Sequence, residues 1–243
     1  IPDNTNEKTV GNASFATINK AVVNDIVANK YQNIELTFLY NGKNIVVQLY
    51  QVNLFSEGFH LDTDRNKNVP YQQGVYYRGI VKGDYTSVAS FNFFNNELNG
   101  IISNSELSNL IIGKLNTKEN TTDYIIYADA NLKILNPFSC SFKDDDFTAT
   151  QMPALSDNKD SNSTRCVTMY FEIDYDLYQQ NGSDSTATTN WMTSVFNNVQ
   201  TLFNNDGITV SLRSVYIWTT QDPYEGIGTT SVAYLYKFNE VRP

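Results

Sequence analysis

The stretch Ile34-Glu-Leu-Thr-Phe-Leu-Tyr40-Asn-Gly-Lys-Asn44-Ile-Val-Val-Gln-Leu-Tyr50 decides the fold of the first half of this chain. Two runs rich in β-branched and aromatic residues flank Asn41-Gly42, which is the strongest short-range signal for a β-hairpin. Further runs of this kind follow, and turn signals separate them. They predict strands at 76–81, 88–94, 100–103, 110–115 and 124–128. We therefore expect an antiparallel sandwich or barrel-like domain over residues 1–135.

The sequence before the hairpin is compatible with two structures. Residues 14–30 carry apolar side chains at helical or mixed spacing, which fits either a short helix or an irregular lead-in. Residues 136–165, after the last expected strand, are polar and rich in small side chains. That composition predicts an exposed linker that proteases can reach.

A different pattern begins after the linker. Residues 167–173 and 208–218 are strand candidates, and residues 185–205 between them are typical of a helix. Ser185 or Thr186 can cap the start of this helix, and Gly207 follows its end. Its apolar side chains are expected on one face at Trp191, Val195, Val199 and Leu202.

A strand, a helix and a returning strand form a βαβ unit, whose two strands usually lie parallel in one sheet. One such unit is too small to be a domain. We therefore expect residues 166–243 to be an incomplete α/β piece, with the rest of its sheet missing or supplied elsewhere. The whole chain is expected to be α+β.

Composition excludes two classes of partner. The net charge is −9, and the sequence has no basic stripe, so nucleic-acid binding is not expected. No apolar run approaches the roughly 20 residues that a membrane-spanning helix needs.

Histidine is scarce in this sequence. His60 is the single histidine in 243 residues, whereas zinc hydrolases bind their metal through several clustered imidazoles. We assign no catalytic residue and no metal ligand to this chain. It is expected to have no peptidase activity by itself.

Two sets of motifs resemble one family. Tyr77-Arg-Gly-Ile-Val-Lys-Gly-Asp84, Ser87-Val-Ala-Ser90 and Glu97-Leu-Asn-Gly-Ile-Ile102 resemble the propeptide of reprolysin-type, adamalysin-like zinc metalloproteases. Residues 166–224 are similar to the first strand, first helix and second strand of the metzincin catalytic domain of that family. Asp174-Tyr-Asp-Leu-Tyr178 matches the Asp-x-x-x-Tyr that closes the first strand.

This resemblance implies a secreted precursor of a zinc endopeptidase, or zymogen, whose signal peptide has been removed. Residues 1–135 would be a propeptide that assists folding and latency, and 166–243 would be the start of the catalytic domain. The intact parent would bind zinc, act on proteins or peptides, and include the remainder of the catalytic domain as a partner. The zinc motif His-Glu-x-x-His-x-x-Gly-x-x-His would lie beyond Pro243. Thr168 stands where some members have a calcium-binding Glu, so no calcium site is carried over.

A non-enzymatic reading stays open beside this one. A secreted, β-rich binding or adhesion module would also fit the composition. A His-Glu-x-x-His helix in the reading frame beyond Pro243 would favour the precursor, and its absence would favour the module.

The two cysteines, Cys140 and Cys166, bracket the polar stretch 141–165. In an exported protein we expect a disulfide between them, closing a loop of about 25 residues that contributes on the order of 3 kcal/mol. The alternative is that the Cys140 thiolate occupies the open position of the zinc in the parent and holds the enzyme latent.

Several polar residues are expected to have structural rather than functional roles. Residues 62–68 imitate the start of a calcium loop, but Lys67 replaces its turn glycine, so a polar hairpin tip is expected. Arg78 is expected to pair with an acid such as Asp84. The carboxylates of Glu172, Asp174 and Asp176 are expected to form a solvated strand edge.

Overall fold

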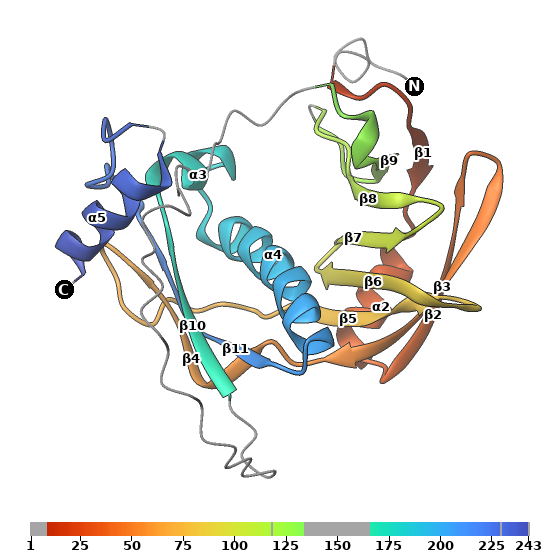
Figure 1. The fold of residues 1–243 in the computed structure, drawn as a ribbon, viewed down its shortest axis with the longest axis horizontal. Coiled ribbons are helices and arrows are strands. Elements are labelled where there is room, and N and C mark those ends of the chain that lie inside the picture. Colours follow the sequence, from red (N-terminus) through yellow and green to blue (C-terminus); the bar gives the residue numbers. More distant parts are fainter. Residues whose placement is uncertain (1–8, 118, 134–165, 229, 243) are drawn as a thin grey trace, which may run out of the picture.

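The computed structural model describes residues 9–117, 119–133, 166–228 and 230–242. Two groups of strands lie on either side of one long helix, α4 (Figure 1). The larger group is an eight-stranded sheet in the order β1-β9-β8-β7-β6-β5-β3-β2, and its neighbours pair antiparallel throughout. Its strands are β1 (Ser14–Thr17), β2 (Asn33–Tyr40), β3 (Lys43–Val52), β5 (Val75–Val81), β6 (Asp84–Phe94), β7 (Glu97–Asn104), β8 (Ser108–Lys114) and β9 (Asp123–Ala128).

The Asn41-Gly42 hairpin is confirmed. Tyr40 at the end of β2 pairs with Lys43 at the start of β3. Asn41 and Gly42 both have positive φ angles, 49° and 76°, which is the conformation that a two-residue hairpin turn requires. The other strands predicted for this half are also present, with ends that differ by a few residues.

The eight-stranded sheet is curled, as the barrel-like expectation implies. Its two edge strands approach each other where the Asn41 amide donates to the Ser14 hydroxyl at 3.2 Å. Residues 14–30 form β1 and then α2 (Lys20–Asn29), whose start Asn19 caps. Helix α2 buries Val23 and Ile26 in the core of this sheet.

Strand β6 is buried on both faces. Residues 89–94 are all buried, whereas most strands of the sheet alternate. Phe91 and Phe93 belong to the inner core beside α2. Ser90 and Asn92 lie on the opposite face, against α4, because α4 packs across β6 and β7. The eight-stranded sheet therefore has a second, partly polar packing face.

The smaller sheet has three strands in the order β10-β11-β4, all parallel. Strand β10 (Cys166–Ile173), helix α4 (Ser185–Asn205) and strand β11 (Thr209–Ile217) form the predicted βαβ unit, which is confirmed. Three further elements are η1 (Asp129–Asn131), α3 (Tyr175–Gln180) and α5 (Ser231–Val241).

The third strand of this sheet, β4 (Phe55–Thr63), comes from the first half of the chain. Strands β3 and β5 pair directly with each other, so residues 53–74 leave the eight-stranded sheet and return to it. We call residues 53–74 the arm. A polar hairpin tip was predicted at 62–68, but no strand was predicted at 55–63, so β4 was missed.

The prediction of which face of α4 is buried is wrong. Trp191, Val195 and Leu202 are 42%, 36% and 63% exposed. The buried face is mostly polar and consists of Thr188, Thr189, Met192, Thr193, Ser194, Phe196, Asn197, Gln200 and Thr201. The reason is the polar outer face of β5–β7, which the helix meets with hydrogen-bonding side chains. Asp184, rather than Ser185 or Thr186, caps the helix by accepting from the amides of residues 186 and 187.

Candidate functional site

The most elaborate site in the described chain is the interface between the eight-stranded sheet and the βαβ unit. It has its own apolar core, to which both halves of the chain contribute. Leu54, Leu61, Tyr76 and Phe94 from the first half are buried with residues of the second half: Ile173, Met192, Phe196, Val210, Leu212, Val215 and Ile217. The three-stranded sheet and this core thus contain residues from both sides of the predicted linker.

Arg78 lies at the centre of the polar part of this interface. Its Nε is 3.4 Å from Asn197 Oδ1, and its Nη2 donates to Gln200 Oε1, so β5 is joined to α4. Burial lowers the pKa of the Arg78 guanidinium, whose described acceptors are neutral amides. The expected pairing with Asp84 is wrong. The Asp84 carboxylate instead accepts from Thr86 and from Asn104 Nδ2 at 3.0 Å.

The amides of α4 extend this network in both directions. Asn197 Nδ2 donates to Asn92 Oδ1 at 2.8 Å, and Gln200 Nε2 donates to the Val210 carbonyl at 2.6 Å. Gln200 therefore connects Arg78 of the large sheet to β11 of the small one. Buried polar groups of this kind stabilise a single arrangement because each loses a partner if the surfaces shift.

The arm meets β11 through main-chain hydrogen bonds as well. The Leu212 amide donates to the Leu54 carbonyl at 2.8 Å. Further along, Ser214 pairs with His60 and Ile217 with Thr63. The register shifts between Leu212 and Ser214, where Gly58 adopts φ 72° and the Arg213 guanidinium donates to a carbonyl of the arm.

Asp64 fastens the end of β4. Its Oδ1 accepts from the amide and the hydroxyl of Thr219 at 2.9 and 2.6 Å, and its Oδ2 accepts from the Thr220 hydroxyl. Burial raises the pKa of the Asp64 carboxyl, but these hydrogen bonds outweigh burial and hold the pKa below its ordinary value. Residues 62–68, which resemble the start of a calcium loop, thus form a polar turn in which Asp64 binds protein groups. His60, on β4, lies near the surface, with its Nε2 3.7 Å from Asp62 Oδ2.

Glu172 forms a second polar cluster near the C-terminal end of β11, where it pairs with Tyr216. The expectation of a solvated edge is wrong for this residue, whose side chain is 4% exposed. Its carboxylate accepts from Trp218 Nε1 at 2.6 Å, Tyr224 Oη at 2.8 Å, Tyr170 Oη at 2.7 Å and Arg242 Nε at 2.9 Å.

Burial raises the pKa of Glu172, but its four donors, Arg242 foremost, lower it more. The cluster anchors the end of α5 to the sheet, and the Arg242 guanidinium also stacks 4.2 Å from the Tyr216 ring centroid. Asp174 caps α3, and burial raises its pKa, whereas Asp176 is exposed as expected.

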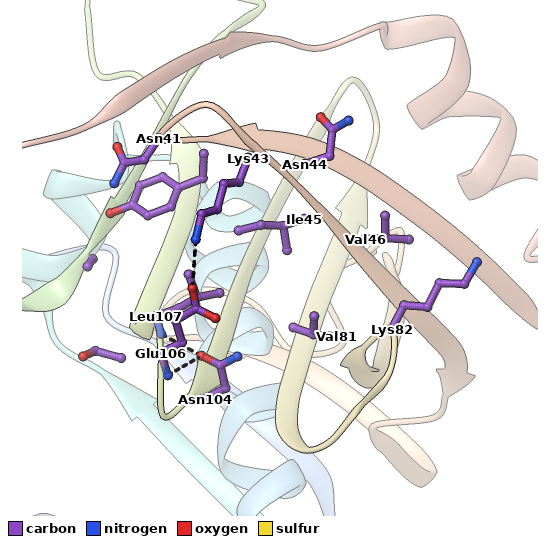
Figure 2. Close-up of a pocket in the computed structure, with 13 residues that line it drawn as sticks. Asn41, Lys43, Asn44, Ile45, Val46, Val81, Lys82, Asn104, Glu106 and Leu107 are labelled. Carbon is purple, nitrogen blue, oxygen red and sulfur yellow. Dashed lines mark hydrogen bonds and ion pairs between the residues drawn. The ribbon is translucent and has the colours of Figure 1, made fainter.

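A hollow of about 600 Å³ opens at one end of the eight-stranded sheet (Figure 2). Lys43 crosses it to Glu106, with Nζ 3.2 Å from Oε1, and Asn104 Oδ1 accepts from the amides of Glu106 and Leu107. The ion pair is exposed, and Asn104 holds the β7–β8 turn. None of the residues that line this hollow is a histidine or cysteine, and we assign it no chemistry.

Of the two cysteines of the predicted disulfide, one, Cys166, is among the described residues. Cys140 lies outside the described residues. Cys166, at the start of β10, is a free, exposed thiol with its Sγ 3.4 Å from Ser211 Oγ. The disulfide and the zinc-latency thiol both stay predictions.

The described residues do not fit a catalytic metal centre. Within ranges 9–117, 119–133, 166–228 and 230–242, no three histidine, cysteine or carboxylate side chains converge to hold a metal ion. The sequence supplies one histidine, whereas zinc hydrolases bind their metal through several. Thr168 is exposed on β10. No helix in the described part is long and apolar enough to cross a membrane.

The fold and the interface define a mixed α+β protein in which a curled antiparallel sheet is docked on one βαβ unit of a parallel sheet. The model of the reprolysin (M12B) family of zinc metalloproteases matches residues 165–242. That match contains β10, α3, α4, β11 and α5. The resemblance stated for this part of the chain is confirmed as similarity to part of a zinc metalloprotease. The match does not include the eight-stranded sheet or the arm.

Proposed function

We propose that this chain is the N-terminal part of a secreted zinc endopeptidase precursor. The eight-stranded sheet and the arm would be its pro-region, and residues 166–243 would begin its catalytic domain. One observation carries the proposal: the segment similar to a zinc metalloprotease shares a sheet and a core with the first half of the chain, through β4 and β11.

A role in folding follows from this shared core. Leu212 and Phe196 of the reprolysin-like segment are fully buried, and their core includes Leu54, Leu61 and Phe94 of the first half. Removing the first half would expose this apolar surface to water. The free-energy cost would be about 25 cal/mol per Å² of apolar surface exposed. The pro-region thus supplies packing that the incomplete βαβ unit lacks.

The remainder of the catalytic domain is the proposed partner of two other surfaces. In the order β10-β11-β4, both β10 and β4 are edge strands of the described three-stranded sheet. The edge at β10 belongs to the reprolysin-like segment itself and would accept another strand of the catalytic domain. Trp191, Val195 and Leu202 of α4 form an exposed apolar row. Single exposed apolar residues are ordinary, but an aligned row on one helix is typical of a surface that another part of a protein covers.

The pro-region would keep the parent latent until the linker at residues 136–165 is cut. The parent would then act on proteins or peptides with zinc as its cofactor. The Cys140 thiolate would be one route to that latency. The alternative is a disulfide between Cys140 and Cys166, which would tether the pro-region instead.

The test begins with the reading frame beyond Pro243, where we expect His-Glu-x-x-His-x-x-Gly-x-x-His. The full precursor should then bind zinc and, once its linker is cut and the pro-region is removed, hydrolyse casein in a chelator-sensitive manner. Replacing the Glu of that motif with Gln is the matched control, because it removes the general base and spares the ligands. A reading frame without the motif would refute the precursor and favour a binding or adhesion module.

A further inference from the structure

The arm is longer than the eight-stranded sheet requires. Strands β3 and β5 are antiparallel neighbours in which Val52 pairs with Tyr76, and two residues suffice to join such strands. The chain instead places residues 53–74 between them and carries β4 across to the other sheet. In Figure 1 the arm runs in orange away from the larger sheet and lies beside β11.

We propose that the arm is a docking element that holds the two regions together as one particle after the linker has been cut. This inference rests on the proposed function for its meaning, since it says how the pro-region stays on the catalytic segment. The partner of the arm is β11, and the mode of binding is addition of a parallel strand to a sheet edge.

Side chains give this strand addition its strength. Leu54 is fully buried and Leu61 is 2% exposed, and both pack in the core of the reprolysin-like segment. Phe55 and Phe59 stack on each other with ring centroids 4.5 Å apart, and Phe55 also meets Tyr76 at 5.7 Å. The strand therefore adds a row of apolar anchors to its main-chain hydrogen bonds.

The two ends of the strand fix its register. Leu54 accepts from the Leu212 amide at one end, and Asp64 accepts from Thr219 and Thr220 at the other. A slip of one residue would turn Leu61 away from the core, so the pairing is strongly specified. The arm is joined to the eight-stranded sheet at both ends, so cutting the linker leaves both of its attachments intact.

The experiment uses the whole chain with a site for a sequence-specific protease placed between residues 141 and 164. The chain is cut to completion, as judged on a denaturing reducing gel, and then examined under reducing conditions by native mass spectrometry and gel filtration. Reduction removes any contribution from the cysteines. We expect a single particle near the 27.5 kDa of the uncut chain.

Two variants locate the attachment. Leu61→Asp places a carboxylate in the shared core and is expected to let the cut pieces separate. Tyr85→Asp is its control, because Tyr85 is 89% exposed on β6. Asp64→Ala is a milder variant that spares the core, and loss of hydrogen bonds to a charged acceptor should weaken association at least about tenfold. If Leu61→Asp prevents folding before the cut, Asp64→Ala alone decides.

Two results would overturn the inference. Cut wild-type pieces that separate in native buffer would show that nothing non-covalent holds them. Pieces of Asp64→Ala and Tyr85→Asp that stay together with equal affinity would show that the arm is dispensable and that α4 holds the regions by itself. Neither result touches the proposed function, which the reading frame beyond Pro243 tests separately.

Discussion

The carboxylate of Asp64 binds Thr219, which lies 155 residues later in the chain, through both its amide and its hydroxyl at 2.9 and 2.6 Å. Asp64 follows a strand of the arm, and Thr219 follows β11. Their contact closes the ends of two parallel strands that the linker separates in sequence. The same pair ties the first half of the chain to the region similar to a zinc metalloprotease.

Asp64→Asn should destabilise the chain by about 1.5–3 kcal/mol at neutral pH, because a charged acceptor of three hydrogen bonds is lost. The folded pKa of Asp64 lies below its unfolded value of about 3.9, so its contribution is complete above that pH and is lost as the pH falls through the folded pKa.

Urea unfolding of wild type and Asp64→Asn should therefore differ by a constant amount between about pH 6 and 8 and converge below about pH 4. The exposed Glu57→Gln on the same arm is the control and should stay near wild type. A difference that grows on acidification would contradict the assignment.

Gly79→Ala should cost on the order of 3 kcal/mol. A Cβ at Gly79 would lie 1.8 Å from the Gln48 carbonyl oxygen, so β3 and β5 would have to move apart, and the arm starts and ends on these strands. Gly113→Ala is the matched control, since a Cβ there meets nothing within 4 Å. Equal thermal melting points for the two variants would refute the explanation that Gly79 is needed for the close approach of β3 and β5.

Glu172→Gln should lower the free energy of unfolding by on the order of 2–3 kcal/mol, since it removes the charged acceptor of Trp218, Tyr224, Tyr170 and Arg242. Tryptophan emission reports the change, because Trp218 loses a bond to a carboxylate. The control is Glu225→Gln at an exposed position. Unchanged emission and stability would mean that the cluster does not form.

Cys140 and Cys166 should be joined when the protein is made in an oxidising compartment. Intact-mass analysis of the non-reduced protein after alkylation should then show no added label. Two labelled thiols in the native exported protein would remove the disulfide model. They would leave the Cys140 thiolate as the remaining hypothesis for the role of this cysteine in latency.

The elements with strong local signals were predictable. Asn41-Gly42 specifies its hairpin by turn chemistry, and residues 185–205 have the length and end signals of a helix. The buried face of α4 was not predictable, because its surroundings are polar. Asn197 and Gln200 are buried there because Arg78 on β5 and Asn92 on β6 face them. No periodicity of apolar residues carries that information.

Strand β4 was missed for a related reason. Phe55, Phe59 and Leu61 occupy alternate positions that hint at a strand, but Gly58 and a register shift interrupt the pattern. Its partner β11 lies about 150 residues away, and parallel pairing leaves no turn signal between the two. The polar cluster around Glu172 was missed because its donors come from four separate places in the sequence.

Hydrogen exchange of the backbone amides in β4 and β11 tests the central claim, that the first half of the chain completes the sheet of the reprolysin-like segment. We expect the amides of 55–63 and 209–217 to be protected to a similar degree in the intact chain. Leu61→Asp should lower the protection of 209–217 far more than that of β7 and β8. Rapid exchange across 55–63 in the wild-type chain, with β11 fully protected, would contradict the central claim.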